Sequence, residues 1–153
     1  MRSATSILVC VLALLLAACG DGGDSRLGRA VAAAAEPAVA AFVTDLEADR
    51  LDAARTRGTA EFQAAASVES MRVVTASLRG VMGALAGRTF VEAGDLRPTA
   101  AEGELPGAAT LLYAGRYAKG TADLRVRVLR GRDGVWRIDG FAAESPALTW
   151  RLR

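Results

Sequence analysis

The chain has 153 residues, of which 24% are charged and 5% aromatic, and it contains no histidine. This length fits one domain with a mainly aliphatic core. The 19 basic and 17 acidic residues are interleaved, and because no basic cluster stands out we expect no nucleic-acid partner. The lack of histidine, with only two cysteines, excludes His-dependent serine or thiol catalysis and a zinc site with the usual ligands.

Residues 1–18 have the layout of a secretory signal peptide. A short positive start precedes the apolar run Ile7–Leu16, and small residues precede Cys19. Taken to Ala18, this apolar run of about 12 residues reaches only ~18 Å as a helix, which is too short for a hydrocarbon core of ~30 Å. Residues 16–19, Leu-Ala-Ala-Cys, resemble the lipobox of bacterial lipoproteins. The resemblance implies cleavage before Cys19 and a diacylglyceryl thioether on its sulfur, which would anchor the protein to membrane lipid.

Lipidation would leave the mature domain without a free thiol or a disulfide, since Cys10 is removed with the signal peptide. The stretch Gly20–Ser25 is rich in glycine and aspartate, so we predict that residues 19–26 form a lipidated N-terminus and flexible tether. An Asp-rich calcium loop is the alternative, but the spaced ligands and terminal glutamate of such loops are missing. We expect the protein in the cell envelope: on the outer membrane facing the periplasm in a two-membrane organism, and otherwise on the outer face of the cytoplasmic membrane.

The first part of the domain has apolar residues at helical spacing. Leu27–Ala35 is alanine-rich, Pro37 breaks or restarts the pattern, and a main helix is predicted from about Glu36 to Asp49. Leu51–Arg55 is predicted as a short second helix that stops near Gly58. One buried stripe is expected on the main helix, formed by Val39, Phe42, Val43 and Leu46.

A third helix is predicted after Phe62, which is expected to pack under the connection. Ser67 is a favourable N-cap, Glu69 lies in the first turn, and Gly87 is the expected stop. The apolar positions at helical spacing are Met71, Val74, Leu78, Val81, Met82 and Leu85.

After Gly87 the apolar period changes to two, which predicts strands. They are expected at Thr89–Ala93, Thr110–Tyr117, Ala122–Arg130 and Val135–Ala142, with a loop from Gly94 to Gly107 and a tail over residues 144–153. Helices followed by hairpin-linked strands predict an α+β domain over residues 27–143. Two to three N-terminal helices would pack on one face of a four-stranded antiparallel sheet.

The last hairpin can be predicted in detail. A three-residue turn, Arg132–Gly134, pairs Val128 with Ile138 and Arg127 with Asp139, and it places Gly134 in the left-handed position. The inward side chains would be Val126, Val128, Trp136 and Ile138, and the outward ones Arg125, Arg127, Arg137 and Asp139. We interpret the arginine row as a solvated, partly ion-paired face of the sheet, in preference to an anion site.

A further resemblance covers about Ala38 to Ala143 and rests on six segments: Phe42–Val43, Phe62, Leu78–Leu85, Arg88–Phe90, Gly115–Tyr117 and Asp133–Phe141. Together they look like small exported bacterial domains with the nuclear-transport-factor-2-like (cystatin-like) α+β shape. The most specific part is the terminal strand with Asp-Gly-x-Trp-Arg-Ile. The resemblance implies a curved sheet wrapped on helices, sometimes with a cone-shaped pocket, and it implies no activity.

Three classes of function remain open. We favour a non-catalytic envelope lipoprotein that binds a protein partner or a small apolar ligand. A ketosteroid-isomerase-like enzyme would need a buried carboxylate base and oxyanion donors, for which Tyr113, Tyr117, Glu92 and Asp95 are the nearest candidates. A purely structural envelope role is the third class. We expect no enzymatic activity, cofactor or metal, and we place any ligand between the third helix and the inward sheet face, against Met71, Tyr113 and Trp136. A closed interior would leave only recognition through the surface.

Overall fold

The computed structural model describes residues 22–98, 104–146 and 148–152. Four helices precede five strands in this part of the chain: α2 (Gly22–Glu47), α3 (Leu51–Thr56), α4 (Ala60–Ala65), α5 (Val68–Met82), β1 (Leu85–Arg97), β2 (Ala108–Tyr117), β3 (Gly120–Arg130), β4 (Trp136–Ser145) and β5 (Leu148–Leu152). The strands form one antiparallel sheet in the order β1-β2-β3-β4-β5. The predicted α+β class, with helices N-terminal to the sheet, is confirmed.

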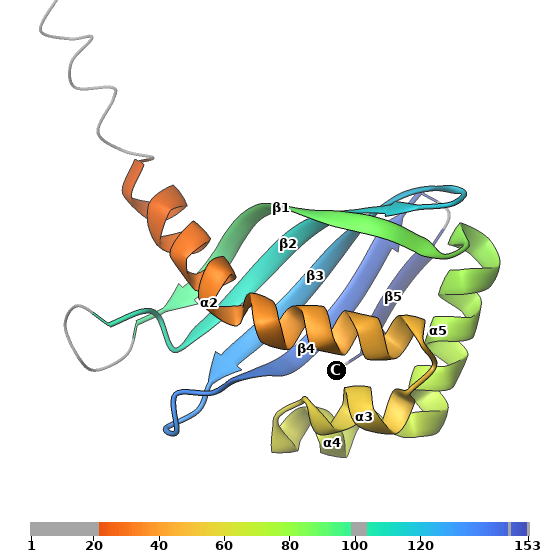
Figure 1. Cartoon of the computed structure of the whole chain (residues 1–153), viewed down its shortest axis with the longest axis horizontal. Helices are drawn as coiled ribbons and strands as arrows, with labels where there is room; N and C mark the ends of the chain where they lie inside the picture. The colour runs from red at the N-terminus through yellow and green to blue at the C-terminus, as the bar shows by residue number, and fades with distance from the viewer. Residues whose placement is uncertain (1–21, 99–103, 147, 153) are drawn as a thin grey trace, which may run out of the picture.

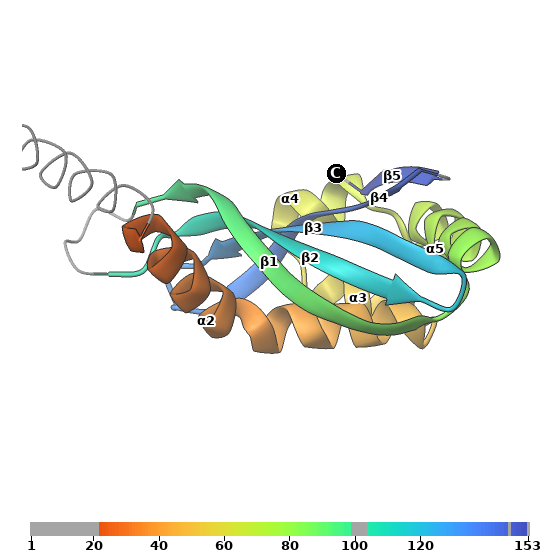
Figure 2. The same ribbon diagram turned by 90° about the horizontal axis from the view of Figure 1, so that it is seen from above.

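The long helix α2 crosses one face of the sheet, and α5 stands beside the end where β2 and β3 connect (Figures 1 and 2). A main-chain hydrogen bond joins the end of α5 to the connection between β2 and β3: Lys119 N–H donates to the Met82 carbonyl at 2.9 Å. The core between the helices and the sheet is mainly aliphatic, with three fully buried rings from Phe42, Phe62 and Tyr113.

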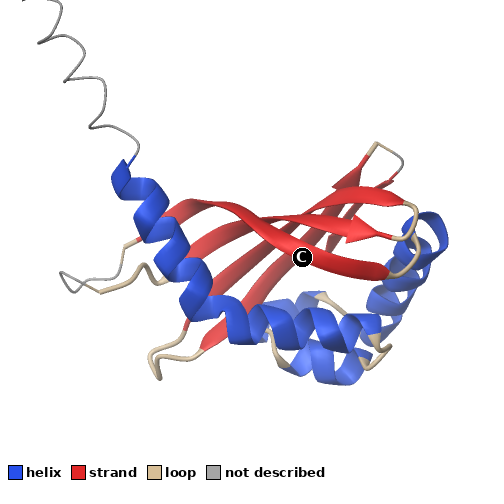
Figure 3. Ribbon diagram, turned by 45° about the horizontal axis from the view of Figure 1, so that its top comes forward, coloured by secondary structure: helices blue, strands red, loops and turns tan. Residues whose placement is uncertain are grey.

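Helix α2 continues through Pro37, so the predicted interruption there is wrong. Proline removes one N–H donor and usually bends a helix, and α2 is bent along its length (Figure 3). The Pro37 ring is exposed to solvent. The opposite face of α2 is buried against the sheet, and this burial stabilises the helix. It carries Val31, Ala35, Val39, Phe42 and Leu46.

The predicted tether over residues 19–26 is helical from Gly22 onward, because α2 begins there. Once later turns are fixed by packing, adding a turn at the helix end costs little free energy. The predicted signal peptide, Cys19 and residues 20–21 lie outside the described residues.

Two elements between α2 and the sheet differ from the prediction. The short helix α4 was not expected; Thr59 caps it by accepting a hydrogen bond from Phe62 N–H at 3.1 Å. Ser67 caps α5 as predicted, accepting from Ser70 N–H. The predicted stop at Gly87 is wrong, because Gly83, with φ of 77°, already supplies the left-handed residue that ends α5.

The sheet is larger than predicted at both edges. Strand β1 continues through the start of the predicted loop to Arg97, and residues 99–103 of that loop lie outside the description. The predicted tail is also wrong: β4 runs to Ser145, and β5 pairs with its residues Phe141–Ser145. Five residues near a chain end give too short a pattern to reveal a strand without its pairing partner.

The last hairpin has the predicted three-residue turn. Val128 pairs with Ile138, Gly131 N–H donates to the Val135 carbonyl at 2.9 Å, and Gly134 has φ of 77°. The predicted register fails one step further on, because a bulge pairs Arg127 with Gly140 and not with Asp139. The extra residue lets Ile138 and Phe141 both reach the core.

Candidate functional site

The structure places the three predicted ligand contacts in separate environments. Met71 is fully buried in α5, Tyr113 is 2% exposed on β2, and Trp136 is half-buried at the start of β4. On β3, Tyr113 pairs with Leu124 and Trp136 pairs with Arg130, six residues further along. Six residues of strand span about 20 Å, so Tyr113 and Trp136 do not line one small pocket.

Tyr113 belongs to a polar cluster between α2 and the sheet. Its hydroxyl donates to Glu36 at 3.2 Å, and the Arg88 guanidinium donates to both Glu36 oxygens at 2.6 and 3.1 Å. Arg88 also lies over the Tyr113 ring, 4.7 Å from its centroid, and Phe90 packs edge-on against it. Burial, with the nearby charge of Glu36, raises the pKa of Tyr113. These groups saturate one another, so the cluster fixes α2 on the sheet and offers no uncommitted carboxylate base.

The space between α5 and the sheet, where we expected a ligand, is nearly filled. The cavity there has a volume of about 20 Å³. That is enough for roughly one water molecule. Of the predicted contacts, neither Met71, Tyr113 nor Trp136 lines it; the tyrosine in its wall is Tyr117.

A larger groove of about 430 Å³ lies on the surface at Trp136, between residues of α2, the end of α3 and the start of β4. Figure 1 shows α2 crossing the sheet over β4. The groove is lined by Ala34, Pro37, Ala38, Thr56, Arg57, Val135, Trp136 and Arg137. Polar and apolar groups share this lining about equally, and Trp136 is its aromatic residue. The volume is within the range of small-molecule sites. We call this site the Trp136 groove.

The free edge of β4 supplies polar groups beside the groove. Ile138 donates its N–H to the Arg57 carbonyl at 3.1 Å and accepts from Thr59 N–H at 2.8 Å, so its main-chain groups point away from β3. Residues two apart on a strand present these groups to the same side, so those of Trp136 share this direction. They have no hydrogen-bond partner in the part of the chain that the structure describes. One N–H donor and one carbonyl acceptor are therefore available at the indole.

The charges around the groove do not cancel. Arg57 bonds to Asp45 at 2.6 Å, and Arg50 bonds to the same carboxylate at 2.7 Å. The hydrogen bond from Arg57, assisted by Arg50, lowers the pKa of Asp45 although burial opposes the shift. Of these three side chains only Arg57 lines the groove, and together the two arginines and the aspartate carry one net positive charge.

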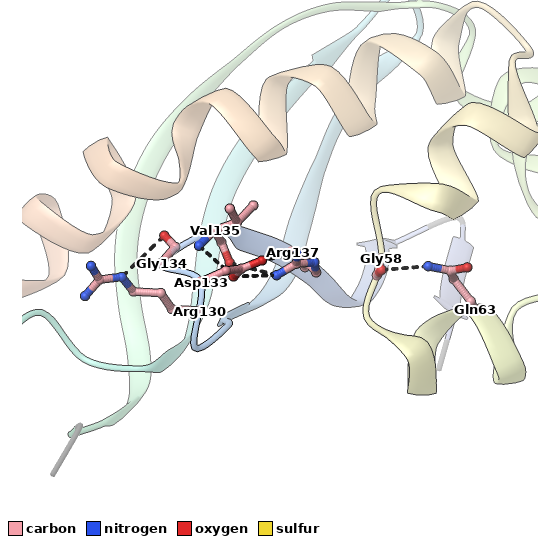
Figure 4. A network of polar contacts seen from close by, with 7 residues as sticks. All are labelled: Gly58, Gln63, Arg130, Asp133, Gly134, Val135 and Arg137. Atoms are coloured by element: carbon pink, nitrogen blue, oxygen red, sulfur yellow. Dashed lines mark hydrogen bonds and ion pairs between the residues drawn. The ribbon is translucent and has the colours of Figure 1, made fainter.

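Across the groove, Arg137 forms a two-bond pair with Asp133 of the turn, at 2.6 and 3.0 Å (Figure 4). This pairing, together with the Val135 N–H, lowers the pKa of Asp133. The pair is neutral overall. It fits the predicted ion-paired sheet face, as does the bond between Arg127 and Asp139 at 2.7 Å.

Comparison with family models, with curated proteins and with solved structures gives no match. The segment Arg26–Glu47 of α2 is long and apolar enough to cross a membrane by length and composition, and 39% of its apolar 18-residue stretch is buried in the domain. Within the described ranges, no group of three acidic, His or Cys residues could hold a metal ion.

Proposed function

We propose that this protein is an exported lipoprotein whose domain binds a small apolar carboxylic acid in the Trp136 groove without catalysing a reaction. The carrying observation is the combination of a groove with apolar walls at Trp136, Val135 and Pro37, a free strand-edge N–H of Trp136, and the part-exposed guanidinium of Arg57. Apolar area supplies affinity in such sites, and a few polar groups supply orientation.

The chemistry of the lining selects the ligand. The apolar body would lie on Trp136, Val135 and Pro37. The carboxylate of the ligand would accept hydrogen bonds from the main-chain N–H of Trp136 and from the Arg57 guanidinium. Arg57 keeps exposed donors because its side chain is 42% exposed. At roughly 0.3 kcal/mol per heavy atom, a ligand of about 20 heavy atoms would bind with Kd on the order of 10–100 μM.

The anchor in this proposal is the lipobox of residues 16–19. Cleavage would release a mature chain that begins at Cys19, held at the membrane by its lipid. Two or more acyl chains anchor a protein stably, while one does not. The cell envelope is the location that this chemistry implies, and the resemblance to nuclear-transport-factor-2-like domains is part of the same proposal.

The ligand is tested with 2-naphthylacetate on the mature protein in lipid nanodiscs. By isothermal titration calorimetry we expect saturable binding, and roughly tenfold weaker binding of the neutral 2-naphthaleneethanol, because one charge-assisted bond is worth about 1.4 kcal/mol or more. Trp136→Leu and Arg57→Gln should each weaken the binding of 2-naphthylacetate. The matched control Val91→Ala changes an exposed apolar residue of β1 outside the groove and should bind normally. Unchanged affinity in Trp136→Leu, or equal affinity for the acid and the alcohol, contradicts the proposal.

A further inference from the structure

The hydroxyl of Tyr117 is buried without a hydrogen-bond partner among the described residues. Tyr117 ends β2 and is 5% exposed. Tyr113, by contrast, donates its hydroxyl to Glu36. A buried hydroxyl without a partner costs about 1–3 kcal/mol, and such groups are rare in folded proteins. We therefore expect a bound molecule to form a hydrogen bond with the Tyr117 hydroxyl.

The cavity of about 20 Å³ under α5 lies beside this side chain, because Tyr117 is one of its walls. Most of the enclosing surface is apolar: Val43, Leu46, Val74, Leu78, Leu85, Leu124 and Phe141. Thr75 and Arg79 of α5 also line the cavity, and each donates to a main-chain carbonyl: Thr75 to Met71 at 2.9 Å and Arg79 to Glu47 at 2.8 Å. Glu47, at the end of α2, contributes a carboxylate to the same cavity. One of its oxygens, Oε2, already accepts from Leu85 N–H at 3.3 Å, and the other has no such bond in the described chain.

The electrostatics keep the Tyr117 hydroxyl protonated. Burial, and then the negative charge of Glu47, raise the pKa of Tyr117 to about 12. At neutral pH the cavity therefore presents an O–H donor on one wall and a carboxylate acceptor on another. A group that only accepts hydrogen bonds would leave the Glu47 carboxylate without a donor.

A hydroxyl group can pair with both polar groups, because it accepts one hydrogen bond, from the Tyr117 hydroxyl, and donates another, to the Glu47 carboxylate. We propose that the cavity between α5 and the sheet is a second binding site, which holds one hydroxyl group between Tyr117 and Glu47. The volume admits a water molecule as the structure stands. A small alcohol presents the same hydroxyl, and its carbon chain would lie along Val74 and Leu78 after α5 moves outward. This site shares no residue with the Trp136 groove.

The first arm of the test is a crystal structure of the mature protein at a resolution that shows ordered water. We expect a water within hydrogen-bond distance of Tyr117 Oη and of the Glu47 carboxylate. Tyr117→Phe should lose this water. Glu47→Gln keeps an acceptor oxygen and should retain it, while Glu47→Leu should not.

The second arm uses the nanodisc-embedded protein with methyl-labelled valine and leucine, titrated with 1-propanol and with 1-fluoropropane, which has no hydroxyl. Saturable shifts of the Val74 and Leu78 methyl signals with 1-propanol alone, lost in Tyr117→Phe and kept in the control Tyr113→Phe, assign the site to alcohols. A bound water without such shifts supports the site with water as its occupant. The proposal is overturned if the cavity holds no water and 1-propanol gives no saturable shift, or if Tyr117→Phe leaves the occupant in place.

Discussion

Asp45 is a buried acid at the unfavourable end of a helix. It lies in the last turn of α2 and is 3% exposed, and the partial negative charge at a helix C-terminus opposes a carboxylate there. Arg57 and Arg50 reverse this penalty with bonds of 2.6 and 2.7 Å. The same contacts hold Arg57 at the rim of the Trp136 groove, so one buried charge serves both stability and the proposed site.

Asp45→Asn should therefore lower the free energy of unfolding by about 1–3 kcal/mol, the value of hydrogen bonds to charged groups. The folded-state pKa of Asp45 is lowered from 3.8, so the wild-type contribution is present above about pH 4 and is lost as the pH falls below it. Urea unfolding between pH 2 and pH 7 measures both effects. The Asn variant should show a shallower loss of stability in acid, and an acid profile identical to that of the wild type would count against this role of Asp45.

At the scale of the elements, the connector between α3 and α4, residues 57–59, covers the part of the β4 edge that β5 leaves unpaired. Gly58 forms a parallel bridge with Ile138, and Thr59 Oγ1 donates to Asp139 at 2.8 Å. The Gly58 carbonyl accepts from the Gln63 side chain at 2.9 Å (Figure 4). Unpaired strand edges invite pairing with other chains, so the connector protects this edge at Ile138, while the main-chain groups of Trp136 have no partner among the described residues.

The connector predicts a strong effect of Gly58→Ala. An added Cβ would overlap ring carbons of Phe62, whose ring is confined by Phe42 at a centroid distance of 5.9 Å. Overpacking of this kind costs about 1–3 kcal/mol, and thermal unfolding of the variant measures it. The matched control is Gly80→Ala in α5, where an added Cβ meets nothing within 4 Å and alanine favours the helix. Equal melting temperatures for Gly58→Ala and the wild type would refute the close approach.

Features set by neighbouring residues could be predicted from the sequence, whereas features set by distant contacts could not. Ser67, Gly134 and the pairing of Val128 with Ile138 follow from local capping and turn rules. The bulge at Asp139 depends on residues far away in the sequence. The alternation of β4 predicted Trp136 as an inward contact near the third helix, whereas the groove at Trp136 lies beside α2. Pro37 and Arg57 carry no local signal, because their role arises only where α2 and the end of α3 meet the hairpin.

At the scale of the whole molecule, α2 sets the distance between the domain and the proposed anchor. The helix begins at Gly22, three residues after Cys19, and three residues reach at most about 10 Å. Ala34 of the groove lies twelve residues further along α2, which is about 18 Å of helix. A lipid on Cys19 would therefore hold the Trp136 groove within about 30 Å of the anchor, close enough to receive an apolar acid that partitions into the membrane.

This arrangement requires that Cys19 carries the lipid. Cys19→Ser should abolish labelling of the protein by a clickable fatty acid and leave an uncleaved precursor of higher mass, because thioether formation needs the sulfur. In-gel fluorescence and mass spectrometry of the N-terminus measure the two effects. The matched control is Cys10→Ser, which changes the other cysteine inside the apolar run and should leave labelling and cleavage intact. Continued acylation of the Cys19→Ser protein, or its release into the soluble fraction by ordinary cleavage at the same rate as the wild type is processed, would remove the anchor and with it the membrane as the source of the ligand.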